Sequence, residues 1–339
     1  MIMILIILLA LTCIGLKRTD AQDECLRKEN TDAIKGIFII IVFYSHILPY
    51  LTNSGVSFSP ILDIPSNKII RMLGQLMVVM FLFYSGYGLI PSLRIKGDGY
   101  IRSIPTKRVL STLVNYDIAV IVFLCMNLLL GIHYPAGKYA LSLIAWDSVG
   151  QSNWYIFAIL CCYASTFISF SLFRKQMYAF ASTVFLLLIY IVVMHEFKET
   201  WWYNIILSYP AGMTVSLYKK QLLSVLERHY VISVTALMLL FIPLFHYRSF
   251  TTVHLAVSVI FAFLIFSVSY KVVINNRILS WCGKNLFMLY VYQRIPMIAL
   301  STLFPYFVRL HPYIYVTCCL AVTLLFAVLI KPVSVTSKN

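Results

Sequence analysis

Residues 31–50 read TDAIKGIFIIIVFYSHILPY. Large aliphatic and aromatic side chains dominate this stretch, and among them stand Asp32, Lys35 and His46. A helix needs about 20 predominantly apolar residues to cross the hydrocarbon core of a bilayer, which is about 30 Å thick. The stretch therefore predicts a membrane-spanning helix that carries ionisable groups into the membrane.

Nine further segments of comparable apolar character follow, separated by short polar breaks. Of the 339 residues, 61% are hydrophobic and 12% are charged, whereas roughly 25% are charged in a soluble domain. We therefore predict an all-α polytopic membrane protein with a ten-helix transmembrane bundle, and we exclude a disordered chain or a disulfide-stapled secreted module. The ten predicted spans are 33–51, 69–90, 110–132, 153–173, 177–194, 202–218, 230–246, 252–270, 284–304 and 312–330.

The chain carries 27 Lys and Arg against 12 Asp and Glu, a net charge of +15. When the breaks are assigned alternately to two sides of a membrane, twenty basic residues fall on one side, the basic side, and six on the outer side, while Arg294 falls within a helix. Basic residues concentrate in cytoplasmic loops. We therefore predict that both ends of the ten-helix block are cytoplasmic, and we expect no nucleic-acid partner. The six basic residues of the outer side are Lys68, Arg71, Lys138, Lys198, Arg248 and Arg309.

The sequence divides into an N-terminal apolar segment with a polar linker (1–29), a transmembrane domain (30–332) and a short C-terminal tail (333–339). Residues 1–16 are apolar but short, and Lys17 and Arg18 follow them. A secretory signal carries its positive charge before the apolar stretch. An additional helix with its N-terminus outside is therefore favoured, and a cleaved signal or a misassigned start are the alternatives.

Lys35 and His46 are eleven residues apart. In a helix this spacing puts the two side chains within about 20° of the same face and about 16 Å apart along the axis. Histidine is suited to take and return a proton near neutral pH, and a lysine at the membrane boundary suits an anion such as a phosphate. The alternative is a snorkelling lysine and an interfacial histidine bonded to a neighbouring helix, and the residues alone leave both readings open.

Four later features are also candidates. Ser85 and Gly86 favour a close helix crossing over a role in a site. The basic run in the loop 94–108 fixes topology or holds a polyanionic ligand. Trp154 suits an interfacial aromatic belt. Arg294 must face a cavity, a carboxylate or an interface, and its place near mid-helix slightly favours a cavity.

At these positions the sequence resembles the acyltransferase 3 family, integral-membrane enzymes that acylate bacterial glycans. Residues 31–50 resemble the family's first-helix motif, an arginine followed after ten residues by a histidine, with Lys35 in the place of the arginine and His46 in that of the histidine. Later family motifs follow in the same order, with Ser111, Leu286 and Gln293 replacing an arginine, a serine and a histidine. The matching stretches are FLFYSGYGLIPSL at 81–93, KRVLS at 107–111, NWYI at 153–156 and GKNLFMLYVYQRIPM at 283–297.

This resemblance implies an O-acyltransferase of the bacterial inner membrane. It would move an acyl group, usually acetyl, from cytoplasmic acyl-CoA to a hydroxyl of a cell-surface or lipid-linked polysaccharide. The resemblance implies His46 as the catalytic residue and Lys35, Lys107 and Arg108 as acyl-CoA-binding residues, and no metal or bound cofactor is expected. Direct transfer and a covalent relay both stay open. The residues expected to shape or line the cavity are Ser85, Gly86, Tyr87, Trp154, Gln293 and Arg294.

Two other functions are kept as alternatives. A transporter or flippase of a glycan or lipid precursor would explain a helical block that has a buried arginine and no soluble catalytic domain. No paired broken helices of the kind found in inverted repeats are evident in the sequence. A catalytically inactive scaffold would explain the departures from the family motifs at Lys35, Ser111 and Gln293.

Overall fold

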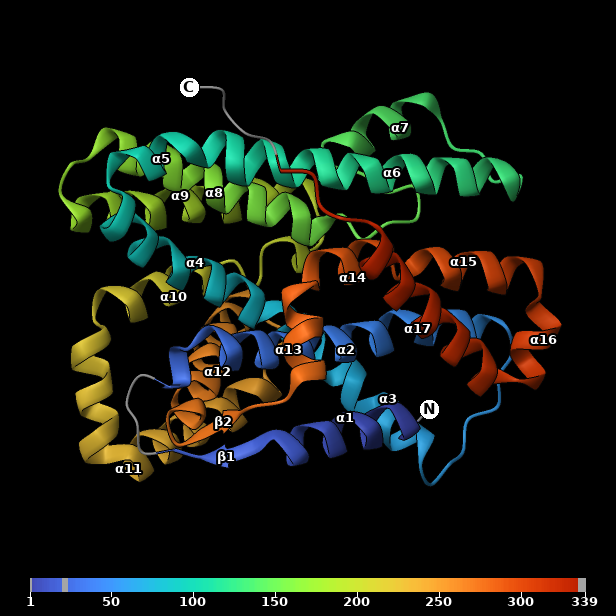
Figure 1. Cartoon of the computed structure of the whole chain (residues 1–339), viewed down its shortest axis with the longest axis horizontal. Helices are drawn as coiled ribbons and strands as arrows, with labels where there is room; N and C mark the ends of the chain where they lie inside the picture. Colours follow the sequence, from blue (N-terminus) through green and yellow to red (C-terminus); the bar gives the residue numbers. More distant parts are fainter. Residues whose placement is uncertain (1, 20–23, 335–339) are drawn as a thin grey trace.

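The computed structural model describes residues 2–19 and 24–334, and its regular structure is almost entirely helical (Figure 1). Within these residues, nine helical stretches are long and apolar enough to cross a membrane. The chain is therefore an all-α, multi-pass membrane protein, as predicted. The nine stretches are α2 (Lys28–Asn53), α4 (Leu76–Lys96), Asp98–Leu129, α8 (Trp154–Leu172), α9 (Gln176–Phe197), α11 (Lys219–His246), α12 (Thr251–Lys271), Leu286–Leu303 and α17 (Pro312–Leu329).

Two of these stretches are composite, and shorter elements connect the rest. Asp98–Leu129 divides into α5 (Asp98–Ile104), a π-helix η2 (Pro105–Leu110) and α6 (Ser111–Leu129). Leu286–Leu303 divides into α14 (Leu286–Tyr292) and α15 (Arg294–Leu303). The shorter elements are α1 (Ile2–Gly15), β1 (Leu16–Arg18), η1 (Glu24–Leu26), α3 (Asp63–Leu73), α7 (Ala136–Leu143), η3 (Thr200–Trp202), α10 (Ser208–Leu217), β2 (Val272–Ile274), α13 (Arg277–Lys284) and α16 (Pro305–Leu310).

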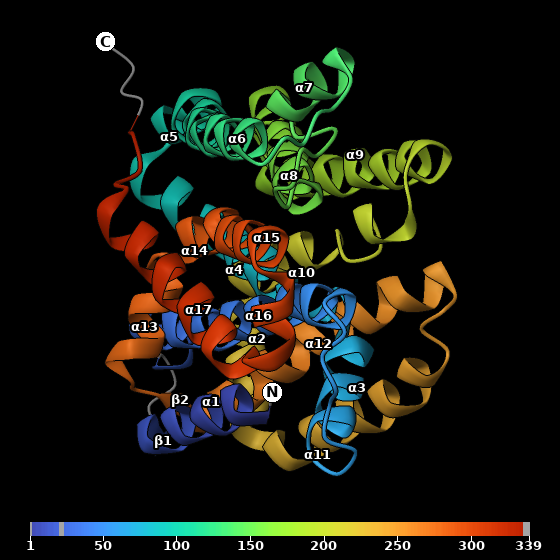
Figure 2. The same cartoon turned by 90° about the vertical axis from the view of Figure 1, so that its right-hand side faces the viewer.

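The helices gather in two groups with a layer between them. In two perpendicular views α5 to α9 lie together at the top, while α1, α2, α3, α12 and α13 lie below (Figures 1 and 2). Helices α4, α10 and α14 occupy the space between the two groups. A site built from α2, α4, α8 and α14 therefore lies in the interior of the bundle.

The segment 202–218 is the one predicted span that the structure replaces with a shorter helix. Its helix α10 has ten residues, which extend about 15 Å, or about half the hydrocarbon core. The residues before α10 form turns rather than helix, and there the Asn204 side chain donates a hydrogen bond to Oε1 of Gln75 at 3.3 Å. A buried turn that contains Asn204 thus takes the place of the first six residues of the predicted helix.

Helices α4 and α10 cross at very short range. A Cβ atom on Gly86 would collide with the backbone oxygen of Tyr209, and one on Gly212 would collide with that of Phe83. Small residues let two helix backbones approach closely inside a membrane. The structure therefore gives Gly86 the packing role that its sequence context favoured.

Helices α2 and α13 meet through a second pair of glycines. A Cβ atom on Gly36 would collide with the backbone oxygen of Leu279, and one on Gly283 with that of Asp32. These two close approaches fix the first turns of α2, where Lys35 lies, against α13. The late family motif begins at Gly283, at the end of α13.

The basic stretch between the second and third predicted spans is helical, which corrects its prediction as a loop. Helix α5 continues through the π-helix Pro105–Leu110 into α6. Such π-helical turns are rare and occur frequently at functional sites. Lys107 and Arg108 both lie in this turn and are exposed.

The N-terminal helix α1 runs from the end of the bundle that holds α3 to the end that holds the paired strands β1 and β2. The backbone N–H of Ile2 donates to Oδ1 of Asp63 at 3.0 Å, at the start of α3. At its other end the chain enters β1, which pairs antiparallel with β2, so that Lys17 lies opposite Val273. The 14 residues of α1 extend only about 21 Å, less than the hydrocarbon core, and the additional membrane helix with its N-terminus outside stays a prediction.

Candidate active site

His46 lies in the second half of α2 and lines a cavity of about 150 Å³ inside the bundle. Four helices and the break before α4 supply its walls, which explains how residues far apart in the sequence meet here. The imidazole therefore faces the interior rather than lipid, as expected for a ring that carries two polar nitrogens. The other side chains of the lining used below are Ser45 of α2, Gln75 before α4, Val78 of α4, Trp154 of α8 and Tyr290 of α14.

The imidazole of His46 packs against an aromatic ring. The ring centroids of His46 and Tyr290 lie 6.1 Å apart, with the ring planes inclined by 55°. Nδ1 of His46 is buried and has no hydrogen-bond partner among the described residues. The guanidinium of Arg294 is close enough to act electrostatically on both rings. The cavity wall therefore includes an imidazole with one buried nitrogen that no described residue bonds.

A row of three buried aromatic rings borders this cavity. The centroids of Tyr290 and Tyr155 are 5.3 Å apart, and those of Tyr155 and Phe81 are 6.0 Å apart. Phe81 follows Val78 by three residues toward the basic end of α4. This aromatic row therefore lies on the basic side of the cavity.

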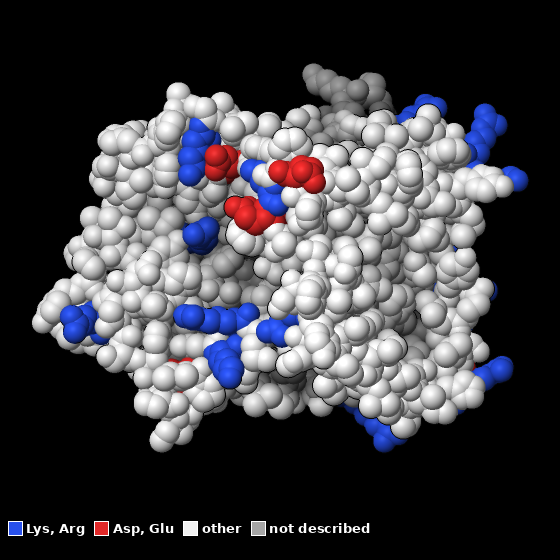
Figure 3. Space-filling model, turned by 180° about the vertical axis from the view of Figure 1, so that it is seen from behind, with Lys and Arg blue, Asp and Glu red and all other residues white. Residues whose placement is uncertain are grey.

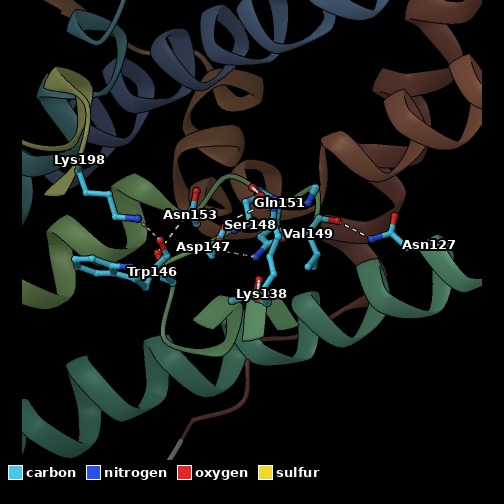
Figure 4. Close-up of polar contacts among 12 residues, drawn as sticks. Asn127, Lys138, Trp146, Asp147, Ser148, Val149, Gln151, Asn153 and Lys198 are labelled. Carbon is cyan, nitrogen blue, oxygen red and sulfur yellow. Dashed lines mark hydrogen bonds and ion pairs between the residues drawn. The ribbon is translucent and has the colours of Figure 1, made fainter. Parts of the chain in front are cut away.

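Gln151, a buried glutamine, makes the hydrogen bonds that hold the loop before α8 (Figure 4). Oε1 of Gln151 accepts the backbone N–H of Val149 at 2.8 Å, and its Nε2 donates to the hydroxyl of Tyr116 at 2.9 Å. Nδ2 of Asn127 in α6 donates to the backbone oxygen of Val149 at 2.6 Å. A buried network satisfied in this way specifies one loop conformation, and Trp154 begins α8 directly after it.

Lys198 ties the same loop to the connection that follows α9. Its Nζ donates to the backbone oxygen of Trp146 at 2.8 Å and lies 4.2 Å and 4.5 Å from the ring centroids of Trp146 and Trp202. Burial lowers the pKa of Lys198, and the nearby carboxylates of Asp147 and Glu199 oppose this shift. The loop before Trp154 is thus held both by side chains of α6 and by Lys198 after α9.

Lys35 forms an ion pair within its own helix. Its Nζ lies 2.6 Å from Oδ1 of Asp32, whose side chain is only 3% exposed. Side chains three residues apart are neighbours on a helix surface, and this partner was not anticipated from the sequence. Lys35 does not line the His46 cavity, since about 16 Å of helix separates the two residues.

Arg108 contacts phenol groups on the basic side of the bundle. Its Nη2 lies 3.5 Å from the hydroxyl of Tyr100, and its guanidinium carbon lies 5.9 Å from the ring centroid of Tyr163. Tyr163 and Trp154 both lie on α8, nine residues apart, which is about 13 Å along the axis. Ser85 lies near the same phenol of Tyr163. The Arg108 cluster and the His46 cavity therefore share α8 but do not merge.

The side chains of Gln293 and Arg294 lie in different surroundings. Gln293 is 1% exposed, donates to the backbone oxygen of Tyr290 at 3.0 Å, and lines a separate apolar cavity of about 150 Å³ beneath α1. Arg294 Nε donates to the hydroxyl of Tyr50 at 3.2 Å. Tyr87 packs against the main hydrophobic core. Of the residues predicted to shape the cavity, only Trp154 lines it directly.

The sequence analysis missed Gln75 and Tyr290 as residues of the site. Gln75 was placed inside the predicted span 69–90, whereas the structure ends α3 at Leu73 and begins α4 at Leu76. Gly74, with φ of +49°, makes this break. A glycine followed by a glutamine within an apolar run was the available signal.

The comparison with protein families agrees with this architecture. The family model described as an acyltransferase domain, acyltransferase 3, matches residues 29–331, nearly the whole chain. No curated protein and no solved structure matches the chain. The chain belongs to the acyltransferase 3 family and is a membrane acyltransferase. The resemblance in the sequence is thereby confirmed, and the family favours an enzyme over the transporter alternative.

Proposed function

We propose that this acyltransferase is an O-acetyltransferase that moves the acetyl group of cytoplasmic acetyl-CoA to a hydroxyl of a cell-surface polysaccharide or of its lipid-linked precursor. The observation that carries the proposal is His46 at the wall of a cavity inside the bundle. A sugar hydroxyl is a weak nucleophile near neutral pH, and a positioned imidazole can remove its proton during attack. A bacterial inner-membrane location with a cytoplasmic C-terminus belongs to the same proposal and rests on the distribution of basic residues.

In the proposed reaction, the neutral imidazole of His46 takes the proton of the acceptor hydroxyl as its oxygen attacks the thioester carbonyl carbon. A C–O bond forms, the C–S bond breaks, and the thiolate of CoA leaves. The imidazolium returns its proton to that thiolate, so the products are an ester and the free thiol. Ser45 also lines the cavity, but adjacent residues on a helix do not face each other, which favours direct transfer over a relay through Ser45.

The donor is proposed to enter from the basic side. Arg108 and Lys107 would hold the CoA phosphates, because a guanidinium and an ammonium both suit phosphate oxygens. The thioester arm would then extend about 13 Å along α8, past the aromatic row of Tyr290, Tyr155 and Phe81, to reach His46. Lys35 has a weaker claim to the phosphates, since Asp32 already neutralises it.

The test uses the purified protein in nanodiscs, radiolabelled acetyl-CoA and the glycan extracted from the producing cells. We expect His46→Ala to lower transfer by at least about a hundredfold while acetyl-CoA binding and thermal unfolding stay unchanged. The matched control is His311→Ala, because His311 is exposed at the start of α17. Wild-type transfer in the His46 variant would remove the catalytic assignment, and failure of the wild type to bind acetyl-CoA would remove the donor.

A further inference from the structure

Two larger cavities lie next to the His46 cavity, in the direction of the predicted outer side. The His46 cavity shares Gly74 and Gln75 with a cavity of about 280 Å³, which we name the arginine cavity. The arginine cavity in turn shares Arg71 and Arg248 with an outermost cavity of about 560 Å³. A ligand that enters from the outer side therefore meets two arginines before it reaches the imidazole.

The electrostatics of this path favour an anion. Arg71 and Arg248 line both outer cavities and Lys68 lines the outermost one, whereas none of the described residues in either lining is acidic. None of these three cations forms an ion pair with a carboxylate among the described residues. On the back of the molecule, Lys and Arg side chains border a hollow in the middle of the face, and Asp and Glu side chains lie at its upper edge (Figure 3). Unpaired cations around a concave surface attract and hold anionic groups.

Phe245 holds the side chain of Arg248 in place. Nη1 of Arg248 donates to the backbone oxygen of Phe245 at 2.8 Å, and the guanidinium carbon lies 4.2 Å from the centroid of the Phe245 ring. A guanidinium carries five N–H donors, so most of them stay available to a ligand. The side chain is thus oriented before any ligand arrives.

Two residues that line the arginine cavity, Asn204 and His254, each carry a buried polar atom without a partner among the described residues. Asn204 and His254 are 4% and 7% exposed, and neither Oδ1 of Asn204 nor Nε2 of His254 has a hydrogen-bond partner among the described residues. Nδ1 of His254 lies 3.2 Å from the backbone oxygen of Arg248, so in the neutral ring Nδ1 carries the hydrogen and Nε2 is an acceptor. Buried acceptors without a donor are costly. Both atoms would be satisfied by hydroxyl groups of a ligand.

We infer that the arginine cavity binds a saccharide that carries an anionic group, with Arg71 and Arg248 on the anion and with Asn204 and His254 accepting from its hydroxyls. The inference rests on the proposed function, because it makes this saccharide the acceptor whose hydroxyl reaches His46 past Gly74 and Gln75. A carboxylate on the sugar and a phosphate of a lipid carrier offer the same chemistry to the two arginines.

Three probes distinguish the sources of the anion. They are a trisaccharide of galacturonate, a neutral trisaccharide linked to a polyprenyl diphosphate, and the free neutral trisaccharide of galactose. Binding of each to the full chain in nanodiscs is measured without donor, and acetyl transfer is measured separately with radiolabelled acetyl-CoA. We expect at least one anionic probe to bind at least about tenfold more tightly than the neutral one, since one charge-assisted hydrogen bond corresponds to about a tenfold change in affinity.

The variants test the two arginines directly. We expect the double variant Arg71→Gln, Arg248→Gln to lose the preference for the anionic probe and to keep its affinity for the neutral one. The matched control is Arg309→Gln, an exposed basic residue of the outer side that lines neither outer cavity. Thermal unfolding checks that each variant folds. Equal affinity of the wild type for charged and neutral probes, or a preference that persists in the double variant, would overturn the inference.

The two readouts separate this inference from the proposed function. If the anionic probe binds through the arginines but no probe is acetylated, the site stands and the proposed function fails. If a neutral acceptor is acetylated and the arginine variants change nothing, the proposed function stands and the anion site fails. A further variant, Asn204→Ala, is expected to weaken binding of all three probes by about two- to tenfold, because it removes an acceptor for hydroxyls. An unchanged affinity would remove Asn204 from the site.

Discussion

The ring centroids of His46 and Tyr290 lie 6.1 Å apart, although the two residues are 244 positions apart in the sequence. Helix α2 and the α14–α15 stretch are joined twice near the cavity, once by the ring contact and once by the hydrogen bond from Arg294 to Tyr50. These two contacts restrict where the imidazole can lie. The position of His46 thus depends on the α14–α15 stretch as well as on its own helix.

The ring contact predicts that Tyr290 is a positioning residue. We expect Tyr290→Ala to lower kcat by about ten- to a hundredfold, because a displacement of about 1 Å in a reacting group can cost that much. The KM for acetyl-CoA should change little, and Tyr290→Phe, which keeps the ring, should restore kcat. The measurement is steady-state transfer with both variants and the wild type. If the phenylalanine variant is as defective as the alanine one, the hydroxyl acts in the reaction and the positioning role is wrong.

The crossing of α4 and α10 predicts a difference between two glycines of similar context. Gly212→Ala should destabilise the protein by about 1–3 kcal/mol, because overpacking a tight contact forces backbone shifts. Gly88→Ala is the control, since nothing lies within 4 Å of a Cβ atom built there. It should be neutral or stabilise by about 0.5–1 kcal/mol, as expected when glycine inside a helix is replaced by alanine. Thermal unfolding in one detergent measures both, and equal effects would contradict the close crossing.

Hydrophobicity predicted the fold class because burial in lipid depends on each segment alone. It placed both ends of five spans within three residues, whereas the helices found for 33–51, 110–132 and 230–246 begin 5 to 12 residues earlier than predicted. It misjudged 202–218, where Asn204 bonds to Gln75 and the chain forms turns before α10. Apolar composition does not reveal whether a segment is continuous helix, since a polar turn can be buried when another part of the chain satisfies it. The helical form of 98–110 was missed for the converse reason, because a run of charges suggested a loop.

The site was predicted in part. The inward orientation of His46 follows from the cost of an unpaired imidazole in lipid, and Trp154 was found through its motif. The remaining lining depends on how the helices are rotated and where they break. Gly74 turns Gln75 into the cavity, and the break at Gln293 turns that side chain toward a different one. Neither rotation is encoded in the spacing of a single helix.

The ion pair of Lys35 predicts a stability effect that a donor-binding role alone would not give. Lys35→Met should destabilise the protein by about 3 kcal/mol, because it leaves the buried carboxylate of Asp32 uncompensated. The double variant Lys35→Met, Asp32→Asn should recover most of that loss. Thermal unfolding of the two single variants and the double variant completes the cycle. Additive losses in the double variant would mean that the pair contributes no coupling energy.

The same double variant separates structure from donor binding. If Lys35 also grips acyl-CoA, the double variant will be stable yet will show a raised KM for acetyl-CoA. If the ion pair is its whole role, stability and KM will both return to wild-type values. Each outcome assigns Lys35 to one role.

Arg108 carries the last prediction, which concerns the donor. Arg108→Ala should raise the KM for acetyl-CoA about tenfold and leave kcat little changed, because a lost charge-assisted hydrogen bond to phosphate corresponds to about that factor. Arg108→Lys should recover part of the loss, since an ammonium still attracts phosphate but cannot bind it in a bidentate way. The sharper measurement replaces acetyl-CoA with acetyl-pantetheine, which has no phosphates. With that donor, wild type and Arg108→Ala should have the same KM, and a difference that persists would show that Arg108 acts through the packing of Tyr100 and Tyr163 rather than on the donor.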